Sequence, residues 1–381
     1  MTFNSASAII LCYNNGVFTP HFHITPAITN ALMSVEADRQ AVDQLPIDVE
    51  MLASLRETAR LVATHYSTQI EGNRLTQEQV QQTLAGARFP GRERDTQEVK
   101  NYYRALEEAE QMAQRPGPLV EADIRKLHGL VIDGQPSPTP YRDGQNVICD
   151  SLSNAIIYLP PEAKDVPALM ADLVAWVTEE LTGGELPAPL IAALAHYQFA
   201  TVHPYYDGNG RTARLLTTLI LHKAGYSLKG LYSLEEYYAR DLAGYYEALA
   251  AGPSHNYYFG RADADMTGFV AYFCRSMAEA FAAVRTQASR AGQRGASDRS
   301  PLLRQLDPRQ RRLLALFRRQ GTATAAEVAA HLSLSVRTVV GLCRGWVSGG
   351  FLSLHDPSRK NRSYRLGPNY ERLVTEVEIE R

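Results

Sequence analysis

The chain has 381 residues, 45% of them hydrophobic, and a formal net charge of −2. The length predicts two or three domains, and the longest apolar runs fall far short of a membrane span, which excludes an integral membrane protein. The near-neutral total hides an uneven distribution, because residues 299–367 hold 13 Lys and Arg against 3 Asp and Glu. This leaves residues 1–298 acidic and predicts two bodies with different electrostatic roles.

The first residues and the cysteines indicate a cellular compartment. Residues 1–14 lack a basic region, and the apolar patch at 8–12 is too short for a signal peptide. The four cysteines are scattered without paired spacing, which favours free thiols in a reducing compartment over disulfides or a zinc site. We therefore expect a cytoplasmic protein without membrane attachment.

Helical spacing of apolar residues dominates the first three quarters of the chain. Helices are predicted at 48–69, 77–85, 98–114, 121–132, 166–181, 189–200, 212–223, 235–251 and 269–286. Two short β-prone runs about a polar turn predict a hairpin at 146–161. Residues 287–300 have no apolar periodicity and are predicted to be a linker.

The basic C-terminal region is predicted to form its own domain, residues 301–370. A helix at 308–320 precedes a helix-turn-helix pattern at 324–347, and two strands follow around a basic tip. This order resembles a winged helix. Arg337 and Arg344 should face outward from the recognition helix, and the wing carries Arg359, Lys360 and Arg362. The charge suits DNA, and a basic protein-interaction or dimerisation module is the alternative.

The most informative segment is His-Pro-Tyr-Tyr-Asp-Gly-Asn-Gly-Arg-Thr-Ala-Arg at 203–214, followed by an apolar run. A loop that opens into a helix here would create an anion site at the helix N-terminus. His203 could take a proton from an attacking hydroxyl near pH 7, and Asp207 beside phosphates would need a cation such as Mg²⁺. Two arginines, Arg211 and Arg214, are unfavourable at a helix start unless an anion lies between them.

The segment resembles the signature of the Fic family, His-Pro-Phe-x-Asp-Gly-Asn-Gly-Arg-x-x-Arg, with Tyr205 in place of Phe. The resemblance implies a mainly α fold: a Fic-type helical core with a β-hairpin flap, here followed by a winged helix-turn-helix domain. It also implies an enzyme that binds ATP with Mg²⁺ and transfers AMP to a Ser, Thr or Tyr hydroxyl of a target protein. It implies that His203 is the catalytic base, that Asp207 binds the metal ion and that Arg214 binds the γ-phosphate. The other residues implied to bind ATP are Gly208, Asn209, Gly210 and Arg211.

The resemblance extends on both sides of this motif. It implies that Tyr245 and Tyr246 bind ATP, with the second ring near the adenine. Residues Ala155, Ile156, Ile157 and Tyr158 of the hairpin would form the flap that pins the target chain by strand addition. His196, on a helix face upstream of the motif, is expected to be structural.

A second motif lies far upstream. The segment from Ser67 to Gly72 matches the inhibitory pattern [Ser/Thr]-x-x-x-Glu-[Gly/Asn] of many Fic proteins. Alone, such spacing is common, and Glu71 would be a solvated helix end. Together with the motif at 203–214 it implies an N-terminal inhibitory helix, in which Glu71 pairs with Arg214 and keeps it from the γ-phosphate.

The resulting layout is an N-terminal helical region with the inhibitory helix at 1–104, a Fic core at 105–286, the linker, and the winged helix. Two alternatives stay open: removal of AMP or transfer of another phosphoryl group by the same fold, and a DNA-binding regulator that senses a nucleotide. The sequence leaves open which protein is the target, and the chain itself is one candidate. It also leaves open whether the chain forms a homodimer.

Overall fold

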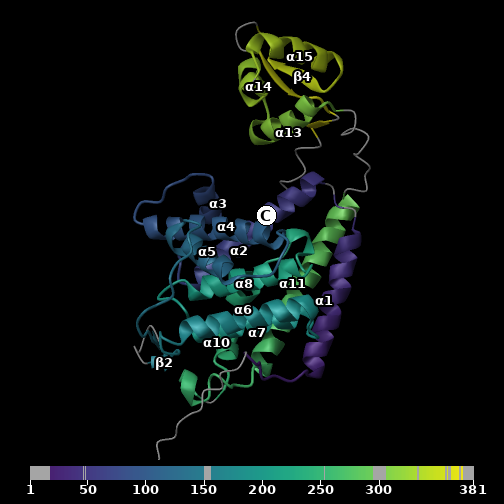
Figure 1. The fold of residues 1–381 in the computed structure, drawn as a ribbon. Helices are drawn as coiled ribbons and strands as arrows, with labels where there is room; N and C mark the ends of the chain where they lie inside the picture. The colour runs from purple at the N-terminus through teal and green to yellow at the C-terminus, as the bar shows by residue number, and fades with distance from the viewer. Residues whose placement is uncertain are drawn as a thin grey trace, which may run out of the picture. The chain divides into compact units, whose positions relative to one another are not determined.

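The computed structural model describes residues 18–45, 47, 49–149, 156–252, 254–294, 306–332, 334–356, 358, 362–368 and 370–371. It is mostly helical, as predicted, and divides into two compact units, Met1–Gly292 and Gln293–Arg381 (Figure 1).

The first unit consists of helices and one short hairpin. Its helices are α1 (Pro26–Gln44), α2 (Val49–Ile70), α3 (Gln77–Leu84), α4 (Glu93–Ala113), α5 (Glu121–Asp133), α6 (Val166–Gly183), α7 (Ala188–Val202), α8 (Asn209–Lys223), α9 (Glu235–Arg240), α10 (Leu242–Leu249) and α11 (Thr267–Arg294), with short 3₁₀ turns at Leu228–Gly230 and Tyr257–Phe259.

The structure departs from the predicted helices at three places. Helix α1 was not predicted, although Thr25 caps it and Pro26 begins it. The predicted helix at 235–251 is two helices, because Asp241 ends α9 and its side chain accepts a hydrogen bond from the N–H of Gly244 in α10. Helix α11 continues to Arg294, so residues 287–294 are helical and not linker.

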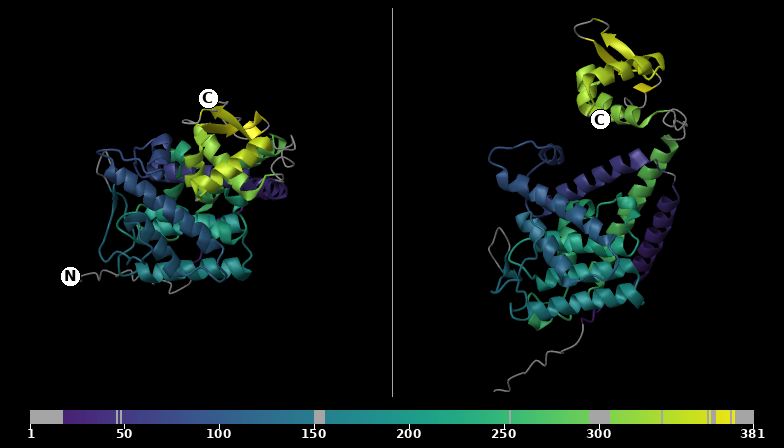
Figure 2. Two further views of the ribbon diagram at one scale, coloured as in Figure 1. Left: turned by 90° about the horizontal axis from the view of Figure 1, so that it is seen from above. Right: turned by 45° about the horizontal axis from the view of Figure 1, so that its top comes forward.

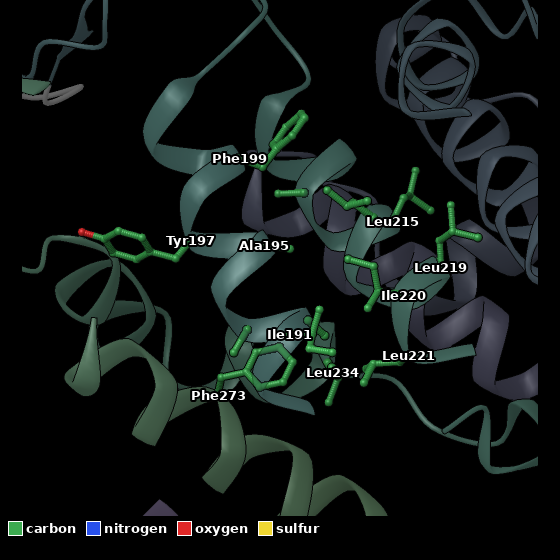
Figure 3. Close-up of a cluster of buried hydrophobic side chains, with 14 of the residues drawn as sticks. Ile191, Ala195, Tyr197, Phe199, Leu215, Leu219, Ile220, Leu221, Leu234 and Phe273 are labelled. Carbon is green, nitrogen blue, oxygen red and sulfur yellow. The ribbon is translucent and has the colours of Figure 1, made fainter. Parts of the chain in front are cut away.

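Helices α7 and α8 form the centre of the hydrophobic core. Almost every side chain of α7 is buried, and its apolar residues pack with those of α8. Figure 3 shows Ile191, Ala195 and Phe199 of α7 beside Leu215 and Leu219 of α8. The loop 203–208 connects these two helices, so the central pair of core helices positions the motif.

The N-terminal helices share this core. Figures 1 and 2 show α1 lying along α11, and Asp38 of α1 pairs with Arg285 of α11 at 2.7 Å. Helix α4 packs against α2, α5 and α8. The boundary predicted between residues 104 and 105 is therefore wrong, since it falls inside α4 and within one continuous hydrophobic core.

The predicted hairpin is present in its described residues. Strands β1 (Ile148–Cys149) and β2 (Ile156–Tyr158) pair antiparallel, with Ile148 opposite Tyr158. Residues 150–155, including the predicted flap residue Ala155, lie outside the described residues. Directly after β2, the N–H of Leu159 donates to the carbonyl of His255, and its carbonyl accepts from the N–H of Tyr257. These bonds tie the hairpin to the segment before α11.

The C-terminal unit has a hydrophobic core of its own. Its elements are α13 (Pro308–Gln320), β3 (Ala323–Thr324), α14 (Ala325–Leu332), α15 (Val336–Ser348), β4 (Leu352–Asp356) and β5 (Ser363–Leu366), with an antiparallel sheet in the order β3-β5-β4. The predicted helices and both predicted strands are confirmed, while the short strand β3 was not predicted.

Within the described ranges, no single helix combines the length and the apolar composition of a membrane span. The bent pair α14 and α15 meets those criteria only when its two helices are taken together.

Candidate active site

His203 ends α7 with a left-handed backbone, φ 51° and ψ 60°, and its N–H donates to the carbonyl of Phe199 at 3.0 Å. Its Nδ1 lies 3.3 Å from the carbonyl oxygen of Ala200. Because a carbonyl can only accept, Nδ1 carries the proton in the neutral ring and Nε2 presents a lone pair. Burial lowers the pKa of His203 to about 4, so the ring is neutral at pH 7.

The loop then opens into the N-terminus of α8. Gly208 has φ 76°, and a Cβ there would lie 2.8 Å from Cδ1 of Ile132, so this position suits glycine alone. The side chain of Asn209 bonds both the N–H and the carbonyl of Tyr205, which fixes the loop. The first N–H groups of α8 have no acceptor within the helix. Such free N–H groups are what an anion can bind at a helix start.

Asp207 and Arg211 pair beside this helix start. Oδ1 of Asp207 lies 3.1 Å from Nη2 of Arg211, and the Asp207 side chain is 64% exposed. The Arg211 side chain is buried and also approaches Glu98 of α4. Among the described residues, no group of three or more His, Cys, Asp or Glu side chains is placed to hold a metal ion. Asp207 is thus an exposed carboxylate next to the start of α8.

The predicted pairing of Glu71 with Arg214 is present. Nη2 of Arg214 lies 2.8 Å from Oε1 of Glu71 and 2.9 Å from the carbonyl oxygen of Ser67, while Nε donates to Oγ of Ser67 at 2.8 Å. Burial alone would lower the pKa of Arg214, but the Glu71 carboxylate raises it overall. A Cβ on Gly210 would meet Oε1 of Glu71 at 2.3 Å. The carboxylate therefore lies directly against the start of α8.

Glu98 connects the inhibitory segment to the motif. Asn73, which follows Glu71 and Gly72, donates through Nδ2 to Glu98 at 3.1 Å. The other carboxylate oxygen of Glu98 lies 3.7 Å from Nη1 of Arg211. One side chain of α4 thus contacts both segments.

The two neighbouring tyrosines, Tyr245 and Tyr246, differ in burial. Tyr245 was predicted to bind ATP, but its ring is buried against Tyr238, and its hydroxyl bonds Nε2 of His196 at 2.9 Å. Tyr245 is therefore part of the core, and its contact with ATP stays a prediction. Tyr246 is 49% exposed, and its hydroxyl donates to the carbonyl of Ile70 beside Glu71. His196 is fully buried and structural, as expected.

The flap residues also divide. Ile156 and Ile157 are exposed, as strand addition would need. Tyr158 was predicted to contact the target, but it is buried, and its hydroxyl donates to the carbonyl of Thr201 at 2.7 Å. Its ring also lies under the guanidinium of Arg261. Tyr158 therefore anchors the flap to the end of α7.

Two residues that hold the motif were not predicted. His128 of α5 stacks on Tyr205 with ring centroids 3.5 Å apart, and its Nε2 donates to the carbonyl of Asp207 at 2.9 Å. Arg142 is buried, and its Nε donates to the carbonyl of His203 at 3.0 Å. A single histidine in a helix and a single arginine in a loop carry no motif, so spacing alone could not have found them.

Comparison with known proteins gives a consistent result. A model of the Fic/DOC family matches residues 118–221. Protein adenylyltransferase fic-1 of Caenorhabditis briggsae is 32% identical over 195 residues, which are 49% of this chain and 36% of that protein. The fic-1 protein of Caenorhabditis elegans is 30% identical over 218 residues, 55% of this chain and 41% of that protein. The matched region spans less than half the length of either curated relative.

Solved structures extend the similarity. A Fic family protein from Desulfovibrio desulfuricans G20 has a TM-score of 0.59 and 25% identity, covering 92% of this chain and 99% of that chain. A fragment of Fic-1 from Caenorhabditis elegans has a TM-score of 0.55 and 25% identity, covering 70% of this chain and 73% of that chain. With the motif of 203–214 set between α7 and α8, these matches identify a Fic/DOC family domain in this chain.

Proposed function

We propose that this chain is a protein adenylyltransferase, which transfers AMP from ATP to a Ser, Thr or Tyr hydroxyl of a target protein. The relatives named protein adenylyltransferase support this reaction. The observation that carries the proposal is the loop between α7 and α8, where a neutral imidazole, a helix N-terminus and the buried arginine of α8 come together.

The reaction needs a base and an electrophile held in line. The target hydroxyl oxygen attacks the α-phosphorus, the bond from that phosphorus to the bridging oxygen breaks, and pyrophosphate leaves. Nε2 of His203 takes the hydroxyl proton, since its lone pair is available at pH 7. Positioning and charge stabilisation supply most of the acceleration in such transfers.

The phosphates fit the start of α8. The N–H groups after Gly208 would bind the α- and β-phosphates, and Arg214 would reach the γ-phosphate. Asp207 offers an exposed carboxylate of the kind that Mg²⁺ uses together with phosphate oxygens. A Mg²⁺ ion held there would neutralise charge on the phosphates.

We further propose that Glu71 holds the enzyme in a low-activity state. Its carboxylate lies on Arg214 and against Gly210, where a phosphate of ATP would otherwise lie. A bound carboxylate and a γ-phosphate compete for the same guanidinium. ATP bound beside Glu71 would therefore have its α-phosphorus misaligned for attack.

The test uses ATP labelled on the α- or the γ-phosphate with Glu71→Gly protein. We expect protein-bound label from the α-phosphate alone, and none after the further change His203→Ala, while ATP binding persists. Label from the γ-phosphate would instead indicate phosphoryl transfer. ATP binding without any label, in the presence of cell extract as a source of targets, would favour the nucleotide-sensing regulator.

For the C-terminal unit we propose a winged helix that contacts double-stranded DNA. Arg337 and Arg344 lie on the exposed face of α15, and the exposed Gly341 between them leaves this face open to close approach. Arg359 and Lys360 lie outside the described residues. Exposed Arg365 of β5 adds a positive charge. The resemblance of the element order to a winged helix and the basic charge support the proposal.

Binding to a short DNA duplex at several salt concentrations tests this surface. Each lost phosphate contact should weaken binding and reduce the salt slope by about one. We expect this for Arg337→Ala and Arg344→Ala, and not for the control Arg319→Ala at the end of α13. Equal effects of all three changes would contradict the assignment of DNA contact to α15, and no binding at low salt would contradict DNA contact and favour a protein-interaction module.

A further inference from the structure

Arg142 lies in the connection between α5 and β1, and only 3% of it is exposed. Its main-chain N–H donates to the carbonyl of Pro204 at 2.9 Å, and its Nε donates to the carbonyl of His203 at 3.0 Å. Nη1 donates to the carbonyl of Gly144 at 3.1 Å, and Nη2 to that of Pro161 at 2.5 Å. Each of these four bonds ends on a backbone carbonyl oxygen, so a buried guanidinium is satisfied by main chain from three segments.

The segment that Arg142 holds has an unfavourable backbone. His203 is left-handed with φ 51°, a region that non-glycine residues adopt uncommonly, although Asn, Asp and His enter it more often than the others. The following Pro204 disfavours it further, because the residue before a proline prefers an extended backbone. The N–H of His203 is held by the end of α7. Its carbonyl, and the next carbonyl along the chain, are held by Arg142.

We propose that Arg142 is a positioning residue for AMP transfer, which holds the left-handed backbone of His203 and ties it to the end of the flap at Pro161. This inference rests on the proposed function. Arg142 contacts the residue that takes the proton and the segment that follows β2, where a target chain would dock. Arg142 thereby helps to set the distance between base and target, together with Tyr158, which bonds the carbonyl of Thr201.

Arg142 makes no hydrogen bond to the residues that are proposed to bind the phosphates. None of its four hydrogen bonds involves Asp207, Gly208, Gly210 or Arg214, so the phosphate site at the start of α8 should keep its geometry without it. Burial lowers the pKa of His203 most, and the positive charge of Arg142 lowers it further, while the charges of Glu71 and Asp207 raise it.

Arg125 provides a matched control. It belongs to α5, close to the same connection, and its Nε also donates to a backbone carbonyl, that of Thr139, at 2.8 Å. Its guanidinium also pairs with Glu121 and lies over the ring of Tyr141. Both arginines thus brace the same part of the chain, but only Arg142 contacts the motif.

The experiment compares Arg142→Lys and Arg142→Gln with Arg125→Lys and Arg125→Gln, all in Glu71→Gly protein. We expect the Arg142 variants to lower the single-turnover rate of AMP transfer by at least about tenfold while ATP affinity stays within about twofold. The Arg125 variants should change neither. Equal losses of ATP affinity and transfer, or an unchanged transfer rate, would overturn the proposal.

A second readout does not depend on activity. In protein with isotope-labelled histidine and no ATP, the Arg142 variants should shift the ring resonances of His203 and leave those of buried His196 in place. A parallel shift of both would indicate general loss of structure and reject the positioning role. If the Glu71→Gly parent transfers no AMP, the proposed function fails, while the histidine resonances still decide whether Arg142 holds His203.

Discussion

Replacing Glu71 with alanine should raise the rate of AMP transfer, and the contacts of Arg214 give the size of the effect. Arg214 donates to one charged acceptor, Glu71, and to the hydroxyl and carbonyl oxygens of Ser67. A hydrogen bond to a charged group contributes about 1.5–3 kcal/mol, and each 1.36 kcal/mol corresponds to a factor of ten in rate. Since the Glu71 side chain is 27% exposed, we expect a gain nearer about tenfold than a hundredfold.

The assay is incorporation of label from the α-phosphate of ATP at subsaturating ATP. The matched control is Glu110→Ala, which removes a 2.6 Å ion pair between Glu110 of α4 and Arg60 of α2 and changes the net charge equally. Ser67→Ala removes only a neutral acceptor and should give a smaller gain, about twofold to tenfold. A Glu71→Ala protein no faster than Glu110→Ala would refute the competition for Arg214.

Four further predictions concern pH and packing. Because the pKa of His203 is lowered to about 4, transfer should show no acid limb near pH 6.5; a midpoint there would assign a different base. In the folded protein the pKa of His196 is about 3 and that of His203 is about 4, both below the usual 6.5. The folded state therefore binds fewer protons than the unfolded state, and the free energy of unfolding should fall as the pH drops from 6.5 towards 4. Denaturant titrations at pH 7 and pH 5 that agree would exclude this. Gly208→Ala should destabilise more than Gly91→Ala, because both have φ 76° but only Gly208 faces a neighbouring side chain within 4 Å; equal urea midpoints would contradict the close packing. Tyr245→Phe should lower stability by about 1 kcal/mol and leave ATP affinity unchanged, whereas a large loss of affinity would restore Tyr245 as an ATP ligand.

The sequence predicted what depends on local spacing. Apolar periodicity located most helices, since a helix that packs on a core must repeat its apolar face. The pairing of Glu71 with Arg214, which 143 positions separate, was anticipated only because two short segments resemble Fic motifs. The Thr25-Pro26 start of α1 is a local signal too, and it was overlooked.

Contacts without a pattern could not be predicted in this way. Which of Tyr245 and Tyr246 is buried depends on how α10 is rotated against α9 and α11, and neighbouring residues on a helix face different sides. Arg142 bonds only carbonyl groups, which every residue possesses, so no partner residue in the sequence points to it.

The left-handed backbone at position 203 also determines which substitution of His203 is best suited to an inactive variant that captures target proteins. Asparagine enters this region more readily than alanine, so His203→Asn removes the base with less disturbance of the loop than His203→Ala. Combined with Glu71→Gly, it should retain nucleotide and target together because no proton acceptor remains. Such a protein, immobilised with ATP, is a suitable bait for isolating the unknown substrate from a cell extract.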